Sequence, residues 1–195
     1  QGDYVLPIDE NTQFEVGYRG SFLNQETDYK VSYLDQGSFR VDNNLSNVLF
    51  YKEHINAAYT QYGKKIDKFS YLLGLRMENS NITINQKTTN DNNLKKYTDW
   101  FPTINLSYEF DETKSITLGY SRRLRRPWSR FLNPFPSRSS ITNIFQGNPD
   151  LDPSYSNAYD FGYLKRWEKF TLNGSVYFQK STSIYQFIVF FSFSI

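Results

Sequence analysis

The sequence contains no cysteine, only one histidine and no long run of apolar residues. Without cysteine the chain has no disulfide framework, no thiolate metal site and no cysteine nucleophile. Its longest uninterrupted apolar stretch runs from Phe187 to Phe191, whereas a helix needs about 20 apolar residues to cross a bilayer. We therefore expect no transmembrane helix.

Neither sign of charge is in excess. The 195 residues include 22 Lys and Arg against 20 Asp and Glu, which gives a net charge of +2. A nucleic-acid-binding domain usually carries a strong positive field, so we expect no nucleic-acid partner. The lone His54 is predicted in the middle of a strand, facing the interior, which is a poor place for a Ser-His-Asp triad. We therefore expect no catalytic site, no cofactor and no metal site.

Aromatic residues, by contrast, are abundant and alternate with polar ones. Aromatic side chains make up 18% of the chain, although only 38% of all residues are hydrophobic. Between Phe69 and Met77 every second residue is apolar, which is the period of a strand with one apolar and one polar face. No segment has a convincing helical period. The same alternation recurs with the apolar sets Phe14, Val16 and Tyr18; Ile55, Ala57 and Tyr59; Trp100, Pro102, Ile104, Leu106, Tyr108 and Phe110; Ile116, Leu118 and Tyr120; Tyr159, Phe161 and Tyr163; and Leu172, Val176 and Phe178.

The connections between these segments alternate between short and long. Short polar turns are predicted at 7–12, 64–67, 111–113 and 167–169, and long loops at about 24–47, 84–96 and 125–154. This is the arrangement of an outer-membrane barrel, which has short periplasmic turns and long extracellular loops. For every short turn to lie on the same side, the apolar patch at 29–34 must form a hairpin within the first long loop. The predicted spans are 1–6, 13–23, 48–63, 67–83, 97–110, 114–125, 155–166 and 169–181.

The lengths of these spans favour a membrane barrel over a soluble sheet. Apart from the first, the predicted strands have 10 to 17 residues, which exceeds the usual five or six and suits a tilted membrane strand. The alternative is a soluble β-sandwich or a wide extracellular barrel. We predict an all-β fold, an antiparallel transmembrane β-barrel with about eight spans. Aromatic side chains expected near the lipid headgroups are Tyr18, Tyr59, Tyr71, Trp100, Tyr108, Phe110 and Tyr120.

Several short motifs follow one another in a fixed order. They are FPTINLSY at 101–108, SITLGYSRR at 115–123 with Arg126-Pro127, LNPF at 132–135, GNPDLDP at 147–153 and YDFGY at 159–163, preceded by DYV at 3–5, FEVGY at 14–18, AAY at 57–59 and LGLRME at 73–78. This ordered series resembles the barrel region of TonB-dependent outer-membrane receptors, in the outer-membrane β-barrel family related to SusC-like transporters. The resemblance covers about residues 1–181.

The resemblance implies a place and a function for the chain. It implies a multi-pass protein of the bacterial outer membrane that takes up nutrients such as metal chelates, glycans or peptides, powered through TonB. The implied partners are membrane lipid and lipopolysaccharide, other outer-membrane proteins that supply missing strands, or a surface lipoprotein. The alternative function is a structural or accessory barrel subunit of an outer-membrane assembly.

The sequence also departs from this family. A complete receptor of this kind has a plug domain, a TonB-contacting segment and a barrel of about 22 strands, whereas about eight spans and no plug are found here. We expect a truncated portion of a larger barrel, or a chain whose partner supplies strands, rather than a barrel that closes on itself. The expected domains are a barrel segment at residues 1–181 and an atypical terminal strand or tail at residues 182–195.

Four arginines mark the predicted mouth of the barrel. Arg122, Arg123, Arg125 and Arg126 lie where a strand leaves the membrane, so they can contact anionic lipopolysaccharide headgroups or line the mouth. The alternative for each is a solvated extension of the strand.

The long loop at 125–154 carries the other candidate contact residues. Asn133, Phe135 and Asn148 belong to turn motifs in which Pro fixes φ and Asn or Gly tolerates positive φ, so they are expected to fold the loop. Asp150 and Asp152 could share a loop cation, although two carboxylates in a Pro-bounded turn are more often solvated.

Overall fold

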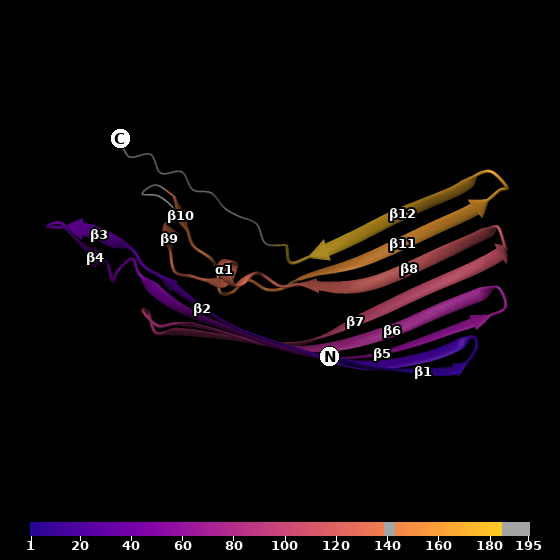
Figure 1. Cartoon of the computed structure of the whole chain (residues 1–195), viewed down its shortest axis with the longest axis horizontal. Coiled ribbons are helices and arrows are strands. Elements are labelled where there is room, and N and C mark those ends of the chain that lie inside the picture. Colours follow the sequence, from indigo (N-terminus) through magenta and orange to yellow (C-terminus); the bar gives the residue numbers. More distant parts are fainter. Residues whose placement is uncertain (139–142, 185–195) are drawn as a thin grey trace.

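Eight long strands form one antiparallel sheet in the computed structural model, which describes residues 1–138 and 143–184 (Figure 1). Their order in the sheet follows the order in the sequence, β1-β2-β5-β6-β7-β8-β11-β12. The predicted all-β antiparallel fold is confirmed. The strands are β1 (Gly2–Asp9), β2 (Thr12–Tyr29), β5 (Asn47–Ile66), β6 (Phe69–Gln86), β7 (Asp91–Asp111), β8 (Lys114–Arg125), β11 (Ser154–Arg166) and β12 (Thr171–Thr182).

Short turns join the strands at one end of the sheet, as predicted. Residues 10–11, 67–68, 112–113 and 167–170 form these turns, which lie together on the right of Figure 1. At the other end, residues 30–46 contain the predicted hairpin, built from β3 (Ser32–Asp35) and β4 (Ser38–Val41). Gln36 and Gly37 close it with φ angles of 48° and 82°, as a tight hairpin turn requires.

The prediction of a long loop at about 84–96 is wrong. Strands β6 and β7 stay paired as far as Gln86 and Asp91, and only residues 87–90 connect them. The polar composition of this stretch resembles a loop, but polar side chains are equally at home on a ladder that extends beyond the apolar band. Asn90, with φ of 56°, closes the turn.

The pairing register defines two faces of the sheet. We call inner the face that carries Arg76 and Glu78 and is covered at one end by residues 126–138 and 143–153, and outer the opposite face. Leu73 and Leu75 lie on the outer face and are 44% and 41% exposed. The outer apolar sets predicted for β2, β6, β7, β8, β11 and β12 are confirmed by the register.

The predicted faces of β5 are reversed. Ala57 pairs with Glu78 and Tyr59 pairs with Arg76, so Ile55, Ala57 and Tyr59 lie on the inner face. His54 therefore lies on the outer face, where its ring meets Phe22 edge-on at 5.4 Å between centroids. The physical reason is that β5 has an ambiguous pattern of small and polar residues, and its faces are set by pairing with the strongly patterned β2 and β6.

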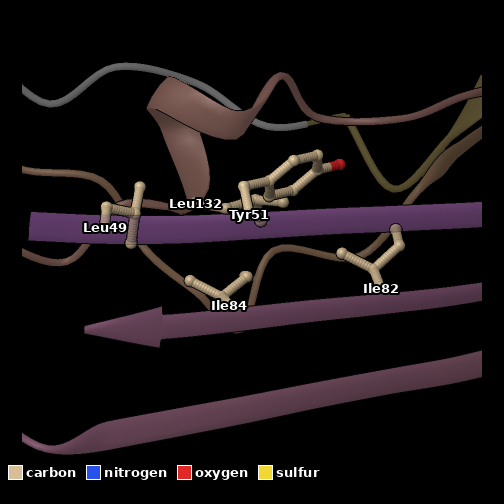
Figure 2. Close-up of a cluster of buried hydrophobic side chains, with 5 residues drawn as sticks. All are labelled: Leu49, Tyr51, Ile82, Ile84 and Leu132. Carbon is tan, nitrogen blue, oxygen red and sulfur yellow. The ribbon is translucent and has the colours of Figure 1, made fainter. Parts of the chain in front are cut away.

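A small hydrophobic core lies on the inner face at the long-loop end. Leu132, at the end of the single-turn helix α1 (Ser129–Leu132), packs on Leu49, Tyr51, Ile82 and Ile84 of β5 and β6 (Figure 2). All five side chains are buried. The core fixes the loop that follows β8 against the sheet.

The sheet remains open in the part of the chain that the structure describes. There, β1 pairs with β2 alone and β12 with β11 alone, so both edges are unpaired. No described helix has the length and apolar character to cross a membrane. The predicted division after residue 181 stays a prediction, because most of the tail at 182–195 lies outside the described residues.

Candidate functional site

Residues 126–138 and 143–153, the described part of what is called segment 126–153 below, fold back over the inner face and build the candidate site. It contains α1 and the short strands β9 (Ser137–Arg138) and β10 (Ile144–Phe145), which pair with each other. Gly147 donates its N–H to Asn133 O at 2.8 Å, and a Cβ at this position would overlap the carbonyl oxygens of Phe131 and Asn133. Glycine is therefore required where the segment closes on itself.

Arg126 ties the start of this segment to the sheet. Its guanidinium donates to the Glu78 carboxylate, to Ser80 Oγ at 2.7 Å and to Tyr97 Oη at 3.2 Å. Arg76 donates to the other oxygen of Glu78 from Nη2 at 2.7 Å and from Nε at 3.1 Å. One carboxylate thus joins two guanidinium groups, and three strand residues, Glu78, Ser80 and Tyr97, hold Arg126 directly.

Burial strengthens the electrostatic interactions within this ion cluster. The side chains of Glu78 and Arg126 are only 8% and 19% exposed, so water does little to screen them. Burial opposes the charge of Arg126, but the hydrogen bonds that the guanidinium donates to Glu78 and Tyr97, together with the attraction of these groups, outweigh burial and raise the pKa of Arg126. Arg126 stays charged under all ordinary conditions, and Glu78 is the carboxylate that compensates it.

A second tie holds the far end of the segment. Lys95 of β7 donates from Nζ to Leu151 O at 2.6 Å and lies 3.6 Å from Asp152 Oδ1. The sequence interpretation did not single out Lys95, Glu78 or Tyr97 as residues that hold the loop. The alternation at 69–77 already predicts that Glu78 points inward, whereas Lys95 lay in a predicted loop and could be placed only once the extended pairing of β6 with β7 was known.

A cavity of about 430 Å³ lies between the segment and the inner face of β2 and β5. Asn133 and Phe135, both predicted as site residues, line it. The Asn133 Oδ1 accepts from Phe135 N at 3.0 Å and from Gln86 Nε2 at 3.1 Å, while Phe135 meets the ring of Tyr29 edge-on at 6.3 Å. These two residues hold the loop in its fold through these contacts and also line the cavity.

The remaining predicted site residues lie outside this cavity. Arg122 lies over the ring of Tyr155 at 5.0 Å, and Arg123 is exposed on β8. Asn148 Oδ1 accepts from Asp150 N at 2.8 Å, which makes that pair a local turn. Of these candidates, the structure brings Asn133 and Phe135 to the cavity and Arg126 and Asp152 to the two ties.

The fold defines the class of protein: an antiparallel meander of long strands with an apolar aromatic outer face, short turns at one end and a folded loop at the other. The model of the outer membrane protein beta-barrel family matches residues 1–192, and the chain belongs to this family. A comparison with curated proteins finds no match. Family membership places the chain in the bacterial outer membrane.

Proposed function

We propose that the chain belongs to a TonB-dependent receptor that crosses the outer membrane several times and takes up nutrients. The observation that carries this proposal is the segment 126–153, which is fastened over the inner face by buried ion pairs and encloses a cavity there. A simple pore does not need a loop that buried ion pairs hold over its inner face. A receptor needs a concave site held on rigid strands at its mouth.

The proposal includes an orientation. Long loops of outer-membrane barrels face the cell exterior and short turns face the periplasm, so the cavity faces the medium. Because the chain has no cysteine, Asp150→Cys and Glu112→Cys each introduce a single thiol. On intact cells a bulky polyethylene-glycol maleimide should label the cysteine at 150 and leave that at 112 unlabelled. The reverse pattern contradicts the orientation.

The uptake role has its own test. A strain that lacks the protein should grow more slowly on particular nutrients, and the wild-type advantage should disappear when TonB is inactivated. Glu78→Gln, which loosens the segment, should reduce uptake, whereas Glu109→Gln in an exposed ion pair should not. Normal growth of the deletion strain on every nutrient tried contradicts the proposal.

The second candidate function is an accessory barrel subunit, and it is favoured by the two sheet edges, which have no partner strand within residues 1–138 and 143–184. Each unsatisfied backbone group costs several kcal/mol in lipid, so the edges of β1 and β12 must pair with other strands there. We propose that such strands come from another outer-membrane protein or from further barrel sequence. A stable stoichiometric partner, recovered together with normal nutrient growth of a deletion strain, supports the accessory role over uptake.

Two further proposals concern partners. We propose that Arg122 and Arg123 contact lipopolysaccharide phosphates, and that a surface lipoprotein is a further candidate partner.

A third proposal is that the chain is not an enzyme. His54 lies on the outer face against Phe22, so His54→Ala should leave growth and uptake unchanged. Loss of function in that variant contradicts the non-enzymatic assignment.

A further inference from the structure

The cavity under segment 126–153 has the size and composition of a small-molecule site. Its volume of about 430 Å³ falls in the range of ligand pockets. Leu49 of β5 lies on the sheet side, and the rings of Tyr29, Phe135 and Phe145 form an aromatic wall. Such a lining suits a ligand with an apolar or aromatic body.

A buried hydrogen-bond donor beside this cavity has no partner. Asn47, at the start of β5, lines the cavity and is 3% exposed, yet its Nδ2 makes no hydrogen bond among the described residues. Its Oδ1 accepts from Thr88 N at 3.4 Å, which orients the amide. Its Nδ2 is closed off from the cavity, so the unpaired N–H contributes a positive partial charge beside the cavity wall rather than a hydrogen bond to a ligand.

The charged side chains that line the cavity in the described part of the chain are all positive. Arg130 and Arg138 both line the cavity, and no Asp or Glu is found among the described residues that do so. The Arg130 guanidinium lies 4.5 Å from the centroid of the Phe145 ring, which holds the charge beside the aromatic wall. The backbone N–H and C=O of Arg138 both bond the Tyr29 hydroxyl, at 2.8 and 3.0 Å, so the rim is fixed.

We propose that this cavity binds a small organic carboxylate with an apolar or aromatic body. The carboxylate is attracted by Arg130, and the body packs on Leu49 and Phe135. This inference deepens the proposed receptor function, because it names the chemistry of the ligand. Binding itself can be measured on the purified chain without any transport.

The first experiment compares two probes of nearly the same shape, one of which ends in a charged carboxylate and the other in a neutral amide. The purified full chain, in detergent with any partner that it requires, is titrated by calorimetry with N-acetylphenylalanine and with N-acetylphenylalaninamide. The acid should bind about tenfold more tightly than the amide, because a hydrogen bond to a charged group is stronger than one to a neutral group. Equal affinities, or binding of neither probe, overturn the proposal.

Variants then locate the binding. Asn47→Asp keeps the acceptor for Thr88 but replaces the free donor with a negative charge, and Arg130→Gln removes the positive charge from an exposed side chain. Each should weaken binding of N-acetylphenylalanine about tenfold. The matched control is Arg125→Gln, which removes the same charge at the same end of the sheet outside the cavity, and it should bind normally.

The results separate the cavity from the transport role. Because Asn47 is buried, its variant can fail to fold, so Arg130→Gln decides the question. An unchanged affinity in Arg130→Gln overturns the site. If the acid binds as expected but a deletion strain shows no uptake defect, the carboxylate site stands and the receptor function fails. If uptake depends on the protein but the purified chain does not prefer the acid, the receptor function stands and the site fails.

Discussion

Glu78→Gln tests whether the buried ion cluster holds the loop on the sheet. The substitution preserves the shape of the side chain and one carbonyl oxygen, but removes the charge that compensates Arg126 and Arg76. We expect it to lower the free energy of unfolding and to expose segment 126–153 to protease.

The magnitude follows from the contacts. Arg126 and Arg76 each lose a charged acceptor, and a hydrogen bond to a charged group contributes about 1 kcal/mol more than one to a neutral group. Repulsion between the two uncompensated guanidinium groups adds to this, partly screened because Arg76 is 35% exposed. We expect a loss of about 2–3 kcal/mol, somewhat below the usual cost of breaking a fully buried pair.

The assay is urea unfolding of the folded chain in detergent, with any partner that it requires, followed by tryptophan fluorescence, with limited trypsin digestion in parallel. Glu109→Gln is the matched control, because Glu109 pairs with Lys65 at 2.9 Å while both side chains are nearly half exposed. The control should lose less than about 1 kcal/mol. If both variants lose the same amount, or if Glu78→Gln digests like the wild type, the cluster does not hold the segment.

Three further changes should give distinct outcomes. Leu75→Lys on the outer face should lower the free energy of unfolding by about 2–4 kcal/mol near the midplane of the bilayer. Gly74→Lys on the inner face should lower it clearly less, and equal losses contradict the assignment of the two faces. Leu132→Ala should cost about 2–4 kcal/mol by opening the small core, and a loss below about 1 kcal/mol contradicts that packing. Hydrogen bonds from the Thr113 hydroxyl and backbone N–H hold the pKa of the Asp111 carboxyl below its usual value. These bonds should stabilise the fold fully above the pKa that Asp111 has in the unfolded chain, and the stabilisation should be lost as the pH falls through the pKa of the folded chain. A normal pKa for Asp111, measured by NMR of the carboxyl carbon, contradicts this.

Period-two patterns predicted the strands well where large apolar and polar residues alternate. Strand β6 is the clearest case, since Leu73, Leu75 and Met77 define one face without ambiguity. Strand β5 misled the interpretation because Ala57 and Ala58 fit either face. Only pairing with the neighbouring strands could decide, and pairing is a non-local property.

The candidate site was predictable only in outline. The Asn-Pro and Gly-Asn-Pro motifs correctly placed a folded loop after β8, and Asn133 and Phe135 line its cavity. The residues that fasten this loop, Glu78 and Lys95, are distant in sequence, and no local signal shows that they contact it. Asn47 was missed for the same reason, because an unsatisfied donor is visible only when all its neighbours are placed.

The central claim is that the outer face defined by the register contacts lipid while the inner face contacts water. Spin labels on single cysteines at Leu75, Thr60, Gln61 and Arg76 test it most directly, in the chain inserted into bilayers with any partner it requires. We expect labels at Leu75 and Thr60, which pair across β5 and β6, to be accessible to oxygen and shielded from a water-soluble nickel chelate. Labels at Gln61 and Arg76 should show the reverse. A water-accessible label at Thr60 beside a lipid-exposed one at Gln61, or four water-accessible labels, would contradict the account.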